Sequence, residues 1–207
     1  GGFNLAESAQ LPKGVRTEKH DVVVIGTGLA GLATAIKASD SGAKVIILEK
    51  AGGDKSGGNS RLSAGIIATP SDNTKQAKDG YYEDFMKKSM GKADPELTRL
   101  LSEQALDGVD WLKAQGMEFM PPISVPGLRG KWVLTAPGIF KGMPKAIERL
   151  LEVLAKRGVK IAYETKAKDL IIDSRGRVVG VKAVNKDGIK DYMAEAVVIA
   201  SGGYSGN

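Results

Sequence analysis

Three glycines at short, fixed spacing are the residues of this chain that most clearly indicate a chemistry. Gly26, Gly28 and Gly31 follow the strand-like run 21–25 and begin an apolar helical pattern, and Glu49 follows a second apolar run. Strand, glycine turn, helix, strand and acidic residue, in this order, form the dinucleotide-binding fingerprint. The glycines allow a tight turn, close approach of a pyrophosphate and close helix packing, and the carboxylate accepts hydrogen bonds from a ribose diol. The alternative is a tight strand–helix turn without a ligand.

The acidic residue also restricts the cofactor. A negative charge at the ribose disfavours a 2′-phosphate, so NADP is a poor candidate, but the glycine turn does not separate NAD from FAD. The N-terminus of the following helix offers N–H donors and partial positive charge to the phosphates of either. The cofactor-binding residues expected around this turn are Gly26, Gly28, Leu29, Ala30, Gly31, Glu49 and Lys50.

The elements that position this turn form an α/β pattern. Buried strands are expected at 22–25 and 44–48 with a helix at 29–41 between them. Asp94-Pro95-Glu96 is a helix start signal. Further helices are expected at 72–90, 94–115 and 145–157. Residues 1–20 indicate a linker or tail, and residues 116–142 indicate loops.

After residue 158 the apolar period changes to two, which is typical of strands. Strands are expected at 159–163, 170–173, 178–184 and 196–200, with hairpin turns at 173–176 and 185–188. The predicted fold class is a Rossmann-like α/β domain with a parallel sheet and a small antiparallel β-meander. The only histidine, His20, falls on the expected linker, where it has no positioned pocket for general base catalysis.

Composition excludes several classes of function. The formal charge of +6 is spread along the chain and only 5% of the 207 residues are aromatic, which disfavours nucleic-acid binding. The absence of cysteine excludes disulfides, thiolate metal sites and a cysteine nucleophile. No apolar stretch reaches the length of a membrane span. The first residue is not methionine, so we expect a processed or trimmed sequence, from either the bacterial periplasm or the cytoplasm.

A second tract of small residues favours FAD over NAD. Residues 57–65 read Gly-Gly-Asn-Ser-Arg-Leu-Ser-Ala-Gly, and composition alone also permits a flexible loop there. Together with 26–31, Glu49-Lys50 and 200–203, this tract resembles the fumarate reductase and succinate dehydrogenase flavoprotein family. The likeness is closest to its soluble flavocytochrome c-like and urocanate reductase-like branch, with ketosteroid dehydrogenases as more distant relatives.

The resemblance implies FAD as the cofactor and extends over residues 19–207. It implies three further groups of contacts: the flavin and pyrophosphate, the isoalloxazine edge, and the adenosine part. The flavin and pyrophosphate would be contacted by Gly57, Gly58, Asn59 and Ser60, and the isoalloxazine edge by Ser63, Ala64 and Gly65. The adenine would be contacted by Thr165, Lys166 and Ala167, and the ADP part would be covered by Ala200, Ser201, Gly202 and Gly203. Small residues suit this role because backbone N–H groups can then reach a ring system and stabilise charge on reduced flavin. The alternative interpretation of segments 165–167 and 200–203 is that each is an ordinary turn after a strand.

The resemblance further implies an oxidoreductase that, when complete, reduces the C=C bond of an unsaturated carboxylic acid by hydride transfer from flavin N5. In that family the proton donor, the carboxylate-binding side chains and a second FAD segment follow the part that corresponds to this chain. We therefore expect residues 21–207 to be the N-terminal portion of an FAD-binding domain, inactive by itself and without a catalytic side chain or a metal site of its own. Its expected partners are the remaining capping and C-terminal part, or a complementing chain, and a small unsaturated acid.

The loop Leu134–Pro144 departs from the family pattern. Pro137 and Phe140 stand in a stretch that is often richer in glycine or bears histidine, so the substrate is left open. Two alternatives also stay open: a stand-alone dinucleotide-binding module without catalysis, and an NAD-dependent dehydrogenase.

Overall fold

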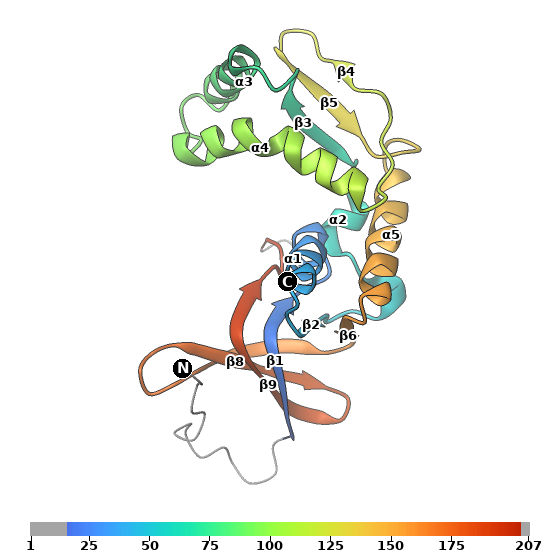
Figure 1. Ribbon diagram of the computed structural model, residues 1–207, viewed down its shortest axis with the longest axis vertical. Helices are drawn as coiled ribbons and strands as arrows, with labels where there is room; N and C mark the ends of the chain where they lie inside the picture. The colour runs from blue at the N-terminus through green and yellow to red at the C-terminus, as the bar shows by residue number, and fades with distance from the viewer. Residues whose placement is uncertain (1–15, 204–207) are drawn as a thin grey trace. The chain divides into compact units, whose positions relative to one another are not determined.

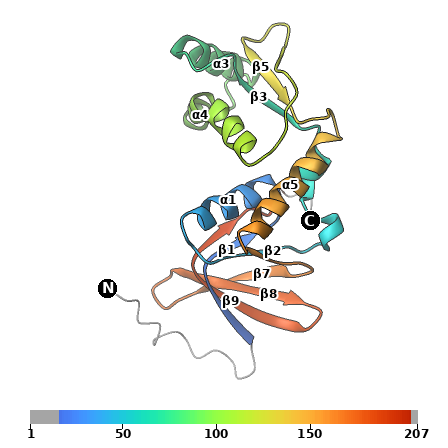
Figure 2. The ribbon, with the colours of Figure 1, turned by 45° about the vertical axis from the view of Figure 1, so that its right-hand side comes forward.

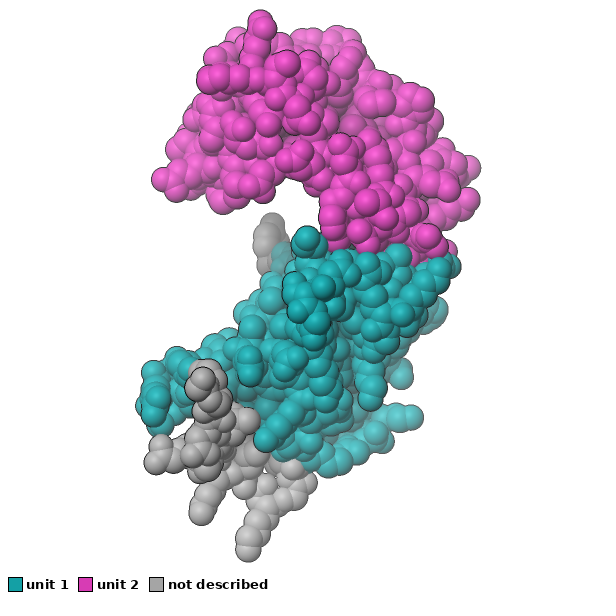
Figure 3. Space-filling view, in the orientation of Figure 1, with its two compact units in different colours: residues 1–61, 151–207 teal, residues 62–150 magenta. Residues whose placement is uncertain are grey.

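The computed structural model describes residues 16–203, which form two compact units. The first unit contains 16–61 and 151–203 of the described residues, and the second contains 62–150 (Figure 3). The expected cofactor turn lies in the first unit.

The first unit is built on a six-stranded mixed sheet (Figure 1). In spatial order its strands are β6 (Lys160–Ala162), β2 (Val45–Leu48), β1 (Arg16–Ile25), β9 (Gly188–Ile199), β8 (Val178–Asn185) and β7 (Lys166–Ile172). β1 is parallel to β2 and β9, and β2 is parallel to β6. β8 is antiparallel to β7 and β9. A parallel Rossmann-like half is thus joined to an antiparallel meander, which confirms the predicted fold class.

The end of β1 (residues 22–25) and the whole of β2 are apolar without interruption, which is typical of parallel strands that are covered on both faces. Helix α1 (Leu29–Asp40) follows β1, and its Leu32 and Ile36 are fully buried. Val181 and Tyr192 of the meander share a core cluster with Val23 of β1. Figure 2 shows α1 on one side of β1 and β2 and the meander strands on the other. The end of β1, where the glycine turn begins, is therefore held from both sides.

The second unit contains a three-stranded antiparallel sheet and two long helices. The strands are β3 (Ile66–Pro70), β5 (Gly130–Leu134) and β4 (Ile123–Ser124), in this order across the sheet. The helices are α3 (Lys75–Lys88) and α4 (Pro95–Ala114). α4 begins as expected, since the Asp94 side chain accepts a hydrogen bond of 2.9 Å from the backbone N–H of Leu97.

Three further helical segments belong to the described part of the chain. A 3-10 turn at Gly53–Lys55 precedes the small-residue tract, and α2 (Gly58–Leu62) lies in it. Helix α5 (Gly142–Lys156) leads from the second unit back to the first. Within residues 16–203, no helix is long and apolar enough to cross a membrane.

The structure differs from the sequence expectation at several elements. β7 begins at Lys166 and β9 at Gly188, earlier than the expected starts at 170 and 196. Strand β1 begins at Arg16, so the expected tail 1–20 is shorter, and residues 1–15 lie outside the described part. The extra strand forms because β9 starts at Gly188 and pairs with it along its whole length. The prediction of loops throughout 116–142 is wrong at β4 and β5, because β5 pairs with the distant β3, a contact that local patterns do not reveal.

Candidate cofactor site

The first glycine turn has the geometry that the motif requires. Gly26 has a φ of +103°, a backbone conformation that residues other than glycine rarely adopt. A Cβ at Gly26 would lie 2.6 Å from the carbonyl oxygen of Ala200. Ala200 itself donates its N–H to the carbonyl of Ile25 at 2.9 Å. The predicted ADP-closing segment that begins at Ala200 therefore lies directly against the turn.

The N-terminus of α1 receives a hydrogen-bond acceptor from a distant part of the chain. Its cap residue, Gly28, has no side chain to accept from the first turn of the helix. Instead, Ser60 Oγ accepts the N–H of Leu29 at 3.0 Å. This bond joins two segments that the sequence separately predicts to hold the phosphates, and it places the small-residue tract at the positive end of the helix.

The carboxylate of Glu49 is buried and held by three donors. Oε2 accepts the backbone N–H of Thr27 at 3.0 Å and also the hydroxyl of Thr27. Oε1 accepts the N–H of Ala51 at 2.8 Å. A carboxylate held at the end of β2 in this way is preorganised to accept hydrogen bonds from a ligand hydroxyl.

The expected adenine segment begins beside Glu49. The N–H of Thr165 donates to the Glu49 carbonyl at 2.8 Å, and Thr165 is buried. Of the two residues that follow it, Lys166 is exposed, whereas Ala167 packs against the core cluster of the first unit. The structure thus brings this segment, the glycine turn, Glu49 and the residues 57–60 together within the first unit.

The three residues expected at the isoalloxazine edge belong to the second unit. Ser63 is exposed, Ala64 is partly buried and Gly65 is buried. The carbonyl oxygen of Gly65 accepts the N–H of Thr135 at 2.9 Å, and the space beside Gly65 is filled by the Thr135 hydroxyl. Thr135 opens the loop that departs from the family pattern, so the 63–65 segment and this loop are joined within one unit.

The remaining expected contacts lie at the surface of the first unit. Those with high exposure are Ala30, Lys50, Gly58, Asn59, Ser201 and Gly202. The residues present fit the ADP part of FAD, because a helix N-terminus, a buried carboxylate and a glycine turn all occur in one place. Assignment of each residue to a cofactor atom stays a prediction.

One buried side chain that joins this network, Thr27, was not among the residues predicted from the sequence. It is fully buried, and its hydroxyl contacts both Glu49 and the N–H of Gly57. The available signal was a hydroxyl-bearing residue at the first variable position of the glycine motif. The motif assigns no role to that position, so the pattern alone did not identify it.

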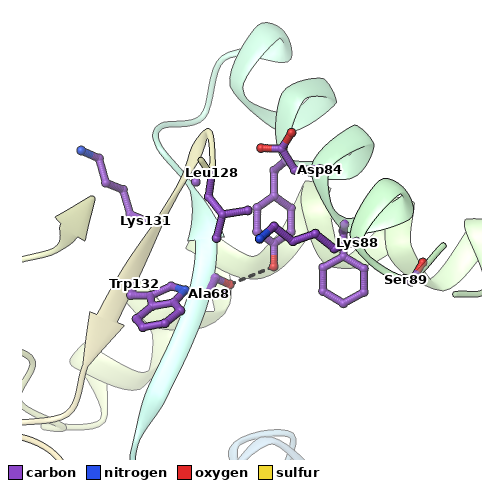
Figure 4. Close-up of a pocket in the computed structure, with 10 residues that line it drawn as sticks. Ala68, Asp84, Lys88, Ser89, Leu128, Lys131 and Trp132 are labelled. Atoms are coloured by element: carbon purple, nitrogen blue, oxygen red, sulfur yellow. Dashed lines mark hydrogen bonds between the residues drawn. The ribbon is translucent and has the colours of Figure 1, made fainter. Parts of the chain in front are cut away.

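A pocket of about 370 Å³ lies in the second unit. Its walls include Tyr81, Phe85 and Leu128, and Figure 4 shows Trp132 and Lys88 at its sides. The Tyr81 hydroxyl donates to the Ala68 carbonyl at 3.3 Å. The lining is mainly apolar, and none of the residues predicted to contact FAD is part of it.

His20, which the sequence placed on a linker, is a buried residue of β1. Its Nε2 lies 2.9 Å from Glu18 Oε1, and Glu18 also pairs with Lys190 of β9. Burial lowers the pKa of His20 in spite of the neighbouring carboxylate. The hydrogen bond from Lys190 lowers the pKa of Glu18 and raises that of Lys190. This cluster is a structural feature of the sheet, since β1 and β9 meet there.

Comparison with known proteins agrees with this geometry. The model of the family described as FAD binding domain matches residues 21–207. The chain is 34% identical over 195 residues to fumarate reductase (cytochrome) of Shewanella frigidimarina, which covers 90% of the chain and 34% of that protein. It is 33% identical over 215 aligned positions to urocanate reductase of Eggerthella lenta, covering 96% of the chain and 34% of that protein. The chain thus spans about a third of the length of these relatives.

Solved structures give the same result. The open conformation of a flavocytochrome c3 fumarate reductase superimposes with a TM-score of 0.79 at 31% identity, covering 90% of this chain and 34% of that one. A 3-ketosteroid-Δ4-(5α)-dehydrogenase from Rhodococcus jostii RHA1 shares the fold, with a TM-score of 0.80 at 24% identity, covering 96% and 48%. The chain belongs to the FAD binding domain family, and it is an FAD-binding domain of the type found in fumarate and urocanate reductases.

Proposed function

We propose that this chain supplies the adenosine- and pyrophosphate-binding part of the FAD site in an oxidoreductase that reduces the C=C bond of an unsaturated carboxylic acid. The observation that carries the proposal is the identity of about a third to a fumarate reductase and a urocanate reductase, over nine-tenths of the chain or more. Bound FAD would supply the hydride, and the residues of this chain would hold and orient it.

Each part of the cradle has a role in that function. The N-terminus of α1 would bind the pyrophosphate through its N–H groups and its partial positive charge. The Glu49 carboxylate would accept hydrogen bonds from the adenosine ribose, and the segment at Thr165–Ala167 would border the adenine. Ala200–Gly202 would close over the ADP part.

The isolated 207-residue chain is expected to bind FAD without turnover. The proton donor and the groups that bind the substrate carboxylates are expected in the part of these longer relatives with which this chain does not align. Fumarate and urocanate, each supplied with a reduced dye as electron donor, are the substrates to test. Steady reduction of either by the purified chain would contradict this expectation.

The visible spectrum of the purified chain tests the cofactor directly. Protein that retains or takes up FAD would be yellow, as an oxidised flavin is, and would release flavin fluorescence on denaturation. Calorimetric titration with FAD and with NAD, in parallel, separates the alternatives. Uptake of NAD without FAD would favour a dehydrogenase, and uptake of neither would favour a module without this catalytic role.

A further inference from the structure

The hydroxyl of Thr27 lies at the centre of a hydrogen-bond relay. Thr27 is fully buried between the first two glycines of the turn. Its Oγ1 accepts the N–H of Gly57 at 2.9 Å and donates to Oε2 of Glu49. One side chain therefore joins the glycine turn, the end of β2 and the start of the small-residue tract.

The direction of this relay is fixed by the chemistry of its two ends. The backbone N–H of Gly57 can only donate, so it must use a lone pair of the Thr27 oxygen. The single hydroxyl proton of Thr27 is then available for Glu49, which accepts it on the oxygen that also receives the Thr27 N–H. Any residue without a hydroxyl at position 27 would leave the buried Gly57 N–H without this acceptor.

The relay also decides which carboxylate oxygen is more open to a ligand. Oε2 of Glu49 accepts two hydrogen bonds from Thr27, whereas Oε1 accepts one, from Ala51. A carboxylate oxygen has about two lone pairs. The hydrogen bonds from Thr27 thus fill Oε2 and direct a ligand hydroxyl toward Oε1.

We propose that Thr27 is a positioning residue for FAD. It orients the Glu49 carboxylate toward the adenosine ribose and, through Gly57, ties that carboxylate to the segment expected along the pyrophosphate. The proposal rests on the cofactor contacts given under Proposed function. Glu49 and Gly57 are therefore coupled through the Thr27 hydroxyl. A substitution of Glu49 is expected to weaken the hydrogen bond that holds the Gly57 N–H.

A double-mutant cycle on the 207-residue chain tests the coupling. Thr27→Val removes the hydroxyl at nearly constant volume, Thr27→Ser keeps it, and Glu49→Gln keeps the length but cannot accept from every donor. We expect Thr27→Val to weaken FAD binding about tenfold and Thr27→Ser to stay within about twofold of the unchanged chain. In the Glu49→Gln background, Thr27→Val should add less than about twofold, because the partner of the hydroxyl is already altered.

Amide hydrogen exchange without ligand gives a second readout. The Gly57 amide should exchange faster in Thr27→Val and also in Glu49→Gln, and should stay protected in Thr27→Ser. This measurement keeps the proposal testable if Thr27→Val folds poorly, since Glu49→Gln and Thr27→Ser are read in the same way.

The outcomes separate the two proposals. If the unchanged chain binds no FAD, the proposed function fails, but the exchange pattern still tests the relay. If the unchanged chain binds FAD, then equal affinity of folded Thr27→Val, additive penalties in the cycle, or an unaltered Gly57 amide in Glu49→Gln would each overturn the role of Thr27.

Discussion

The carbonyl oxygen of Gly26 occupies the space in which a Cβ on Gly31 would stand. The first and last glycines of the motif are therefore in direct backbone contact, and the start of α1 rests on the end of β1. This contact is independent of any ligand. It separates the glycines that the fold needs from those that the cofactor needs.

Gly31→Ala is expected to destabilise the first unit. The added methyl group would overlap backbone atoms that cannot move without shifting α1, and overpacking of this kind costs about 1–3 kcal/mol. Urea unfolding followed by circular dichroism measures the loss. Gly108→Ala in α4 is the matched control, because it meets open space in a helix interior and should stabilise by about 0.5–1 kcal/mol. Equal effects at the two positions would contradict the packing argument.

Gly28→Ala should separate folding from binding. The nearest atom to the added Cβ would be Ser60 Oγ at 3.4 Å, an ordinary contact, so the unfolding free energy should change little. The methyl group would stand where the pyrophosphate is expected to approach the backbone, and FAD affinity should fall by about tenfold or more. Calorimetric titration and urea unfolding on the same protein check both halves. An unchanged FAD affinity would remove Gly28 from the cofactor site.

His20 should make the stability of the chain depend on pH. Its pKa in the folded protein lies below the ordinary value of about 6.5, so the unfolded chain takes up the proton first. The contribution of His20 to the free energy of unfolding is therefore fully present above about pH 6.5, and it is lost as the pH falls toward the lower pKa of the folded protein. Glu18, whose pKa is also lowered, adds a loss in the same direction at more acidic pH.

His20→Gln removes the first of these two losses. We expect the unfolding free energy of the variant to be nearly constant between about pH 7 and pH 5, while the drop at more acidic pH, to which Glu18 and other carboxyl groups with lowered pKa values contribute, is retained. Urea unfolding at each pH provides the comparison. The same slope in both proteins above pH 5 would assign the acid sensitivity to another group.

Asp94→Ala should weaken the second unit by removing the side-chain cap of α4. Loss of such a cap costs about 1 kcal/mol, and Asp94→Ser, which can accept the same Leu97 N–H, should recover most of it. Both tryptophans, Trp111 and Trp132, belong to this unit, so tryptophan fluorescence in urea follows its unfolding. A serine variant as unstable as the alanine variant would show that the cap is not the cause.

The parts of the fold that sequence predicted are those set by local chemistry. The run Val45–Leu48 is apolar at every position and is buried at every position, and the Asp94 cap is a property of four consecutive residues. The hairpins of the meander formed where Asp173–Gly176 and Asn185–Gly188 supply turn residues. In each case the signal and the structure it specifies lie within a few residues of each other.

The parts that sequence did not predict depend on partners far along the chain. Arg16–His20 carry three charged residues and no apolar alternation that identifies a strand, yet they form β1 because β9 offers its edge. β5 forms against β3 in the same way. Thr27 was missed for a related reason, since its role depends on Glu49 and Gly57, which no short motif contains.

The pairing of β1 with β9 has a consequence for how the protein is made. Arg16 pairs with Lys190 and Ile25 with Ile199, so the strand that bears the glycine turn is synthesised long before its neighbour. Domains that depend on contacts so distant in sequence fold slowly and expose strand edges while they wait. Until β9 emerges, β1 has β2 on one side and an open edge on the other, and a nascent chain at that stage is a natural substrate for chaperones.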